Sequence, residues 1–299
     1  MIRKPHHVTI RLNARLGNQM FEYAFARAMS LRLGAQQVHL YCVDPVCLGC
    51  FVLRDDVRFV TDLSGCSSMT RFVSKLCGKV AFWLRNHPWS LYQFELINQW
   101  WYNLCGTYFC LDGYIAPKTH LLGLHNPYLV GYFQSEIFFS TFRNEILRDF
   151  TFRPEIIESC SDLAECIQSS NSICLHIRLG DYLQSSNHFV CDQEYYNKAI
   201  AIVLQLCPEA QFYIFSDCPE RVQSLLPSSL SFTLIPAHYS ASQSLYLGSL
   251  CRHHIISNST FSWWMQYLAY HEKQIVIAPR RWMNDDTPTP QYQSHWTLL

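Results

Sequence analysis

The C-terminal half of the chain alternates short apolar runs with amphipathic segments in a regular order. The apolar runs predict strands over residues 172–179, 211–217, 231–235, 254–257 and 274–278. Amphipathic spacing predicts helices between them, over 192–207, from 219, over 241–251 and from about 259. Repeated strand–helix units of this kind imply an α/β fold with a mostly parallel sheet and right-handed crossovers.

The N-terminal half starts with the same pattern and then becomes less regular. A strand is predicted over 8–12, then a helix with one apolar face that ends at Gly34, and a second strand over 37–41. The aromatic-rich segment 82–109 follows, and most of its aromatic side chains are predicted to lie in the core.

The length and composition favour two domains with sizeable cores. The chain has 299 residues, of which 49% are hydrophobic and 15% are charged, and this balance argues against disorder. Pro154 and the polar stretch 168–171 favour a boundary between the two halves. We therefore predict an N-terminal domain over 1–160 and a C-terminal domain over 161–299.

The charge balance and the chain's N-terminal sequence limit the classes of partner. Lys plus Arg equals Asp plus Glu at 23 each, so no overall field attracts nucleic acid or anionic lipid, and an anionic ligand would be small. No apolar stretch reaches transmembrane length, and no apolar leader precedes the first strand. We expect a cytoplasmic protein with no stable membrane insertion.

The fourteen cysteines are mostly set in apolar runs, where cysteine behaves as a small hydrophobic residue. A disulfide framework is not expected in a long chain without a secretory leader. His39, Cys42, Cys47 and Cys50 could hold a structural zinc ion, but a second C-x-x-C pair is absent. Ordinary thiols are the preferred interpretation.

Arg178 stands at the end of a predicted strand, where alternation sends it to the same face as His176. An arginine in this position can bind phosphate oxygens through two parallel charge-assisted hydrogen bonds. The alternative is a structural ion pair with Asp181. Asp217 stands at the C-terminal end of another predicted strand, where its carboxylate could accept hydrogen bonds from a ribose hydroxyl or a purine.

The stretch Asn258-Ser259-Thr260 admits three interpretations. It could cap a helix, it matches an N-glycosylation sequon that only a secreted protein would use, or its amides and hydroxyls could hold a phosphate at the positive end of a helix. Gly17 and Asn18 lie in an earlier strand-to-helix turn, where Asn18 either caps the helix or faces a substrate.

Several nucleotide and metal motifs are absent from the sequence. The turn at Gly17 lacks the glycine fingerprint of a dinucleotide site and the Gly-Lys-Ser/Thr of a P-loop. The chain has no Asp-x-Asp pair to hold a divalent metal. A metal-free site is therefore favoured, in which an arginine and a helix terminus balance the charge of a diphosphate.

Five motifs in order resemble those of family 11 glycosyltransferases, the α-1,2-fucosyltransferases. They occupy residues 16–21, 131–136, 176–182, 215–217 and 258–264, and the resemblance extends from about residue 10 to 282. It implies a GT-B-like fold in which two Rossmann-like domains face a cleft and the C-terminal one binds the nucleotide sugar. The implied reaction is an inverting transfer of L-fucose from GDP-β-L-fucose to O2 of a galactose in an oligosaccharide acceptor, with no metal and no cofactor.

The resemblance also implies roles for individual residues. Arg178 would bind the pyrophosphate with His176 beside it, and Asn18 would reach the reacting centre. Further donor contacts are implied at Gly17, Ser216, Asp217, Asn258, Ser259, Thr260, Phe261 and Ser262. Acceptor contacts are expected around Tyr132, Gln134 and Glu136. Asp181 is the candidate general base, although Asn18 could instead orient the acceptor hydroxyl.

The chain departs from the family pattern at two positions, with Leu179 where a second Arg is usual and Ala14 where Gly is common.

Two other functions stay open: transfer of a different sugar from another nucleotide, and carbohydrate binding without catalysis. The resemblance suggests a bacterial enzyme that builds surface polysaccharide such as O-antigen and touches the inner membrane at most peripherally.

Overall fold

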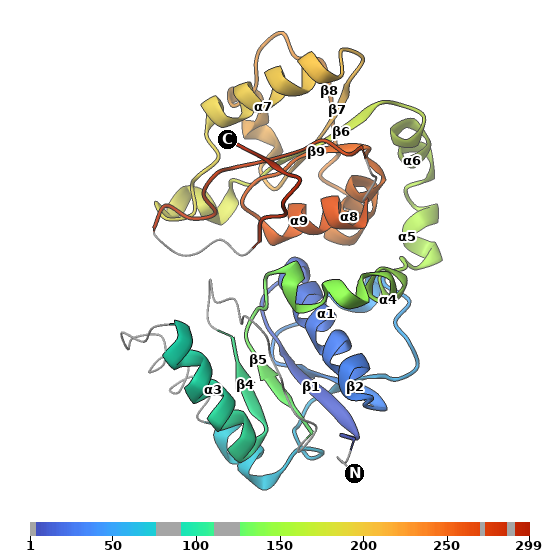
Figure 1. Cartoon of the computed structure of the whole chain (residues 1–299). Coiled ribbons are helices and arrows are strands. Elements are labelled where there is room, and N and C mark those ends of the chain that lie inside the picture. The colour runs from blue at the N-terminus through green and yellow to red at the C-terminus, as the bar shows by residue number, and fades with distance from the viewer. Residues whose placement is uncertain (1–3, 76–90, 111–125, 270–272, 286–290) are drawn as a thin grey trace. The chain divides into compact units, whose positions relative to one another are not determined.

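The computed structural model describes residues 4–75, 91–110, 126–269, 273–285 and 291–299 (Figure 1). The chain divides into two compact units between Thr151 and Phe152. The sequence placed this boundary at 160, in the segment between Pro154 and the polar stretch 168–171. That segment instead contains two short helices of the second unit, α5 (Pro154–Glu158) and α6 (Ser161–Gln168).

The first unit is built on a parallel sheet of five strands in the order β3-β2-β1-β5-β4. The strands are β1 (His7–Leu12), β2 (Gln37–Cys42), β3 (Val57–Val60), β4 (Thr107–Phe109) and β5 (Tyr128–Val130). Its α-helices include α1 (Leu16–Leu33), α3 (Leu91–Cys105) and α4 (Arg143–Asp149). The predicted first strand, helix and second strand are confirmed, and Gly34 ends α1 in the left-handed conformation.

The aromatic-rich segment is only partly described. Tyr102, Tyr108 and Phe109 are buried, as predicted, whereas Trp100 is exposed on α3. The predicted core residues between 82 and 89 lie outside the described residues.

The second unit contains a parallel sheet of six strands in the order β11-β10-β9-β6-β7-β8. The strands are β6 (Ser172–Ile177), β7 (Gln211–Ser216), β8 (Phe232–Leu234), β9 (His253–Ile255), β10 (Val276–Ala278) and β11 (Thr297–Leu298). The longer helices are α7 (Gln193–Leu206), α8 (Ala241–Leu250) and α9 (Thr260–Leu268). Each strand and helix predicted here is present, except that the segment from Pro219 forms a 3₁₀ helix.

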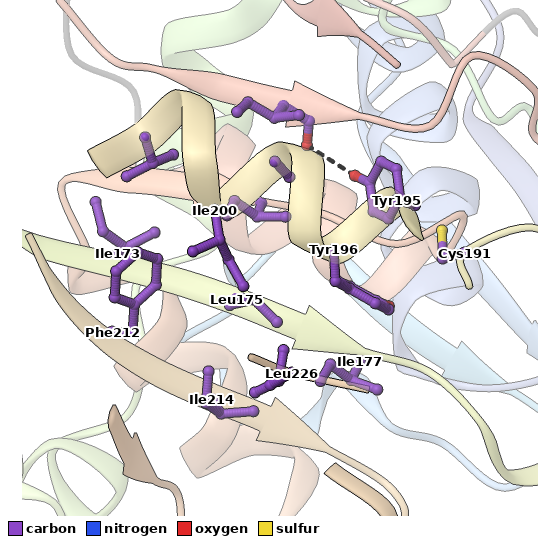
Figure 2. Close-up of a cluster of buried hydrophobic side chains, with 14 of the residues drawn as sticks. Ile173, Leu175, Ile177, Cys191, Tyr195, Tyr196, Ile200, Phe212, Ile214 and Leu226 are labelled. Atoms are coloured by element: carbon purple, nitrogen blue, oxygen red, sulfur yellow. Dashed lines mark hydrogen bonds between the residues drawn. The ribbon is translucent and has the colours of Figure 1, made fainter. Parts of the chain in front are cut away.

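The sheet of the second unit is covered on both faces, which is why β6 is buried along its whole length. On one face Leu175 and Ile214 pack against Tyr196 and Ile200 of α7 (Figure 2). On the other face the Cys174 thiol lies 3.7 Å from the sulfur of Met265 in α9. The strict alternation of β6 therefore sends its side chains into two separate apolar layers.

The cysteines in the described part of the chain are free thiols. The thiols of Cys42, Cys47 and Cys50 each donate to a nearby backbone carbonyl, and His39 bonds to the Gln37 side chain. Within the described ranges, no group of three or more His, Cys, Asp or Glu side chains is arranged to hold a metal ion.

No described helix combines the length and the apolar character needed to cross a bilayer.

Candidate functional site

The strand order of the second unit defines where a ligand would bind. Counted along the chain, the order is 3-2-1-4-5-6: the chain runs from β6 to β8 on one side and returns to β9 on the other. In such sheets, ligands bind beyond the carboxyl ends of the strands at this reversal. The motif from His176 starts in the last residues of β6, the motif from Phe215 lies at the end of β7, and the motif from Asn258 follows β9. The fold therefore brings all three to this edge.

Arg178 lies just beyond β6 and is held by two carboxylates. Its Nη1 lies 2.7 Å from Oδ2 of Asp217, and its Nη2 contacts Oδ1 of Asp181. The ring of Tyr182 lies beneath the guanidinium, with the Arg178 Cζ 5.4 Å from the ring centroid. The ion pair with Asp181 that the sequence left as an alternative is present, and a second pair, with Asp217, joins it.

Asp217 is anchored to the backbone on its other side. Its Oδ1 accepts a hydrogen bond of 2.9 Å from the backbone N–H of Leu179. Oδ2 lies so close to Gly180 that a Cβ at that position would collide with it. Leu179 itself packs in the core, and its backbone rather than a second arginine completes this corner of the site.

His176 is buried between β6 and α9. Its Nδ1 lies 2.8 Å from the hydroxyl of Ser257, and its ring contacts that of Phe261 at 5.7 Å between centroids. Burial lowers the pKa of His176 to about 4, an effect larger than those of the nearby Asp217 and Arg178 charges. The imidazole is therefore neutral at neutral pH and adds no charge to the site.

The first turn of α9 is capped by Ser259, whose hydroxyl accepts a hydrogen bond from the N–H of Phe261. The capping interpretation of this motif is thus confirmed. Ser262 donates to the backbone carbonyls of Ser257 and Ser259 and fixes the approach to the helix. The positive end of the α9 dipole therefore lies at the same sheet edge as Arg178.

Asn258 is buried and forms hydrogen bonds with the loops around the site. Its amide donates to the carbonyls of His188 and Trp282, at 2.9 and 2.8 Å. Its backbone carbonyl accepts from the Tyr182 hydroxyl at 3.1 Å. Both amide hydrogens are thus used within the protein, and Asn258 ties the β6 and β9 loops together.

The remaining predicted donor contacts in the second unit have local roles. The Ser216 hydroxyl accepts from the backbone N–H of Cys218, which shapes the turn after β7. Thr260 and Phe261 are half-buried in the first turn of α9.

The first unit brings together two other predicted residues at its own strand reversal. β1 and β5 are neighbours, and their carboxyl ends carry the Gly17 turn and the segment from Gly131. The side chain of Gln134 donates to Oδ1 of Asn18 at 3.0 Å. The N-cap of α1 is Arg15, so Asn18 does not cap the helix and instead lies within its first turn.

The turn before Gly17 is held by two buried polar residues that the sequence analysis missed. Glu22 accepts from the backbone and side chain of Asn13, and burial raises the pKa of this carboxyl well above its usual value. The Gln19 side chain donates to the carbonyls of Ala14 and Pro45. Their signal in the sequence is two polar residues set among the apolar residues at the start of α1.

The backbone around these residues is unusual at both neighbouring strand ends. Ala14 has φ +58°, a left-handed conformation that glycine adopts more readily than other residues. Gly131 has φ +135°, and a Cβ there would collide with the backbone of Cys110. Among the other expected acceptor contacts, Tyr132 is half-buried and Glu136 pairs with Arg143 at 3.9 Å.

Comparisons with known proteins agree with this fold. O-antigen biosynthesis glycosyltransferase WbnK of Escherichia coli is 29% identical over 182 residues, which cover 57% of this chain and 60% of that protein. An α-1,2-colitosyltransferase of Escherichia coli is 28% identical over 175 residues, covering 54% and 60%. The matches thus span about 60% of the length of these curated relatives.

Similarity to a solved structure extends over more of the chain. FUT1 of Arabidopsis thaliana, solved in complex with GDP, covers 94% of this chain and 72% of its own, with a TM-score of 0.53 and 14% identity. Two α/β units, each with a parallel sheet, constitute the GT-B type of fold.

The family itself is identified by sequence. The sequence model of glycosyl transferase family 11 matches residues 80–299, which include the motifs at Gly131, His176, Phe215 and Asn258. On this match, over more than half its length, the chain belongs to glycosyl transferase family 11.

Proposed function

We propose that the protein transfers L-fucose from GDP-β-L-fucose, with inversion and without a metal ion, to O2 of a galactose in an oligosaccharide acceptor. Family membership supports glycosyl transfer, and the name of one relative supports O-antigen as the kind of product. We place the reaction in a bacterial cytoplasm, with surface polysaccharide as the destination of the product.

The observation that carries the proposal is the position of Arg178 at the sheet edge shared with the N-terminus of α9. When the bond between fucose and phosphate breaks, negative charge develops on the departing GDP. A fixed guanidinium and the positive end of a helix stabilise that charge without metal. His176 stays neutral, so Arg178 would supply the charged contact within this cluster.

Asn18 and Asp181 are proposed to act on the acceptor hydroxyl. The Gln134 amide donates to Oδ1 of Asn18 and constrains this side chain, whose amide is of a type that can donate a hydrogen bond to a hydroxyl oxygen. Asp181 could take the hydroxyl proton only once its carboxylate is free of Arg178. Gly17, Tyr132 and Glu136 remain proposed substrate contacts on the same grounds of sequence resemblance.

Transfer of another sugar is the second candidate, because one relative is an α-1,2-colitosyltransferase. The two possibilities differ in the donor and share the diphosphate-binding residues. Carbohydrate binding without catalysis is a poorer account, since it gives no reason for Arg178 to lie at the strand reversal beside a helix N-terminus.

The test is product formation from GDP-fucose and a β-galactoside such as lactose in the presence of EDTA, with the linkage determined by NMR. We expect an α-1,2-linked fucoside, and a fall in kcat/KM of about 10²- to 10³-fold for Arg178→Ala. Arg252→Ala is the matched control, because Arg252 is an exposed arginine next to the amino end of β9.

Three results would count against the proposal. Transfer from another nucleotide sugar but not from GDP-fucose would favour the second candidate. Activity that EDTA abolishes would contradict the metal-free mechanism. Glycan binding with no affinity for GDP would favour the carbohydrate-binding alternative.

A further inference from the structure

Arg178 cannot bind a diphosphate with its whole guanidinium as the site stands. A guanidinium binds phosphate best through two parallel N–H groups, and both terminal nitrogens of Arg178 are already paired with carboxylates. One positive and two negative side chains make the cluster net negative. The second carboxylate repels an approaching diphosphate, so binding to the arginine is favoured when one carboxylate leaves it.

The two carboxylates are held very differently. The Asp217 side chain is 25% exposed, and the Leu179 N–H and the close approach to Gly180 fix it in place. The Asp181 side chain is 56% exposed and lies in the 3₁₀ segment Gly180–Gln184. Ion pairs open to water contribute only about 0–1 kcal/mol, so the contact with Asp181 is the one that breaks readily.

Arg178 has contacts that would keep it in place after this exchange. The Asp217 pair and the Tyr182 ring are both independent of Asp181. The guanidinium would therefore stay at the sheet edge while its Nη2 side becomes available to the ligand.

We propose that Asp181 is an exchangeable counter-ion that occupies the diphosphate position on Arg178, and that the donor displaces it, while Asp217 remains as the residue that positions the arginine. This inference rests on the proposed use of a nucleoside diphosphate sugar. It means that donor affinity is set by competition with a carboxylate of the protein itself. It also means that donor binding releases the Asp181 carboxylate from its ion pair.

The test is calorimetric binding of GDP and of inorganic pyrophosphate to the full chain, with and without Asp181→Asn. We expect the variant to bind both ligands about 3- to 10-fold more tightly, because the competing charge is gone. The gain should be similar for the two ligands, since the exchange involves only the diphosphate. In the Arg178→Ala background, Asp181→Asn should give no gain beyond that of the control.

The control for general charge is Glu194→Gln, which removes an exposed carboxylate paired with Lys198 on α7 of the same unit. Equal gains for Glu194→Gln and Asp181→Asn would overturn the proposal, and so would unchanged or weaker GDP binding by Asp181→Asn. Failure of the wild-type chain to bind either GDP or pyrophosphate would instead contradict the proposed function. The thermal transition of Asp181→Asn, measured alongside, establishes that the variant is folded.

Discussion

Single residues in the second unit determine what its sheet edge offers to a ligand. Arg178 is placed by Asp217, and Asp217 is placed by the backbone of Leu179 and by the missing side chain of Gly180. The chemistry of the arginine therefore depends on a residue that carries no functional group.

Gly180→Ala tests this dependence. The added Cβ would collide with Oδ2 of Asp217, so the carboxylate or the 3₁₀ segment must move. We expect a loss of about 1–3 kcal/mol in the free energy of unfolding, together with weaker GDP binding. Gly49→Ala is the matched control, because a Cβ at Gly49 meets no atom within 4 Å. Urea unfolding and GDP titration of both variants decide the matter, and equal results for the two would refute the close packing.

His7 gives the first unit a stability that depends on pH. The side chain is only 3% exposed, and its ring stacks on that of His39 with centroids 4.1 Å apart. Burial, followed by the charges of His39 and His6, lowers the pKa of His7 to about 4, against about 6.5 in the unfolded chain. The unfolded state therefore binds more protons between these values, and stability falls as the pH drops from 6.5 to 4.

The expected contribution of His7 to this loss is about 3 kcal/mol in total, from a pKa difference near 2.5. His176 and His39, whose pKa values burial also lowers, add losses of the same sign, so the wild type alone cannot separate the three. The free energy of unfolding by urea is measured from pH 4 to 7 for the wild type and for His7→Gln. The difference between the slopes of the two curves against pH isolates the contribution of His7. Parallel curves for the two proteins would show that His7 does not titrate in this way.

At the scale of elements, the sequence predicted most of the second unit and little of the first unit's edge strands. Long apolar runs mark β6 and β7, Asp192 caps the helix that follows β6, and Ser240 caps the helix that follows β8. The strands β3, β4 and β5 have only three or four residues, and unlike the equally short β8, β9 and β10 they do not lie in a regular alternation of strands and helices along the sequence. Helices α5 and α6 were missed because their serines and acidic residues outweighed the apolar spacing, which in α6 is marked by Ala164 and Ile167.

The same limit applies to the candidate site. Its motifs could be assigned to strand ends, because strand ends follow from the hydrophobic pattern. The pair between Arg178 and Asp217 could not, because it joins residues 39 positions apart through rotamers that packing decides. Gln19 and Glu22 were missed because a helix pattern alone does not tell which polar side chains are buried.

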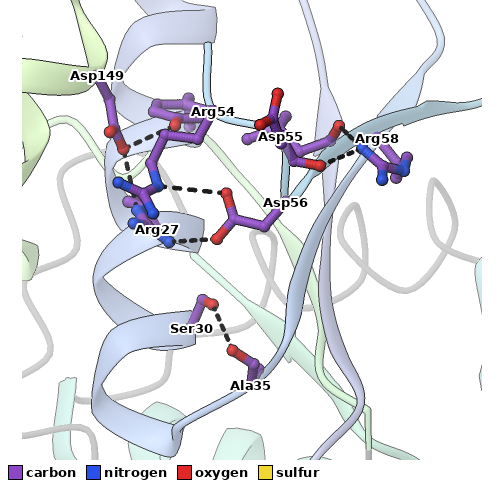
Figure 3. A network of polar contacts seen from close by, with 10 residues as sticks. Arg27, Ser30, Ala35, Arg54, Asp55, Asp56, Arg58 and Asp149 are labelled. Atoms are coloured by element: carbon purple, nitrogen blue, oxygen red, sulfur yellow. Dashed lines mark hydrogen bonds and ion pairs between the residues drawn. The ribbon is translucent and has the colours of Figure 1, made fainter.

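The elements of the first unit are joined by a buried ionic network around Arg27 of α1 (Figure 3). Arg27 pairs with Asp149 at the end of α4 at 2.9 Å, and with Asp56 next to β3 at 3.0 Å. The Tyr23 hydroxyl donates to Asp149 at 2.8 Å. The network thus holds the helix that carries Asn18 against two other elements.

Arg27→Met should cost about 3–5 kcal/mol of unfolding free energy, because it leaves the buried Asp149 without its ion-pair partner. Arg54→Met is the control: Arg54 pairs with Asp56 at 3.4 Å but is exposed, so its loss should cost less than about 1 kcal/mol. The double variant Arg27→Met/Asp149→Asn should recover part of the loss, since the buried charge is removed. Chemical denaturation of the four proteins measures this, and similar costs for Arg27 and Arg54 would contradict the role of burial.

At the scale of the whole molecule, both units reverse their strand order beside the first strand, and each reversal carries motif residues. In the first unit the reversal lies between β1 and β5, and in the second between β6 and β9. Among the described residues, the second unit has Arg178, held by Asp217, beside the Ser259-capped N-terminus of α9, whereas in the first unit Arg15 is the N-cap residue of α1 and makes no side-chain capping hydrogen bond. Under the proposed function, we expect the charged donor at the reversal of the second unit and the neutral acceptor at that of the first.

Hydrogen exchange with and without GDP tests that division of labour on the intact chain. At a GDP concentration 100 times its Kd, binding stabilises the folded protein by about 2.7 kcal/mol. This slows the exchange of amide hydrogens whose hydrogen bonds open only after the ligand has dissociated. We expect the protection in residues 178–181 and 259–262, with little change in 14–18 and 131–136. Arg178→Ala should remove the protection, whereas Arg252→Ala should keep it. Protection confined to 14–18 would place the nucleotide in the first unit, because amides there could then be slowed only by a ligand bound at the reversal between β1 and β5.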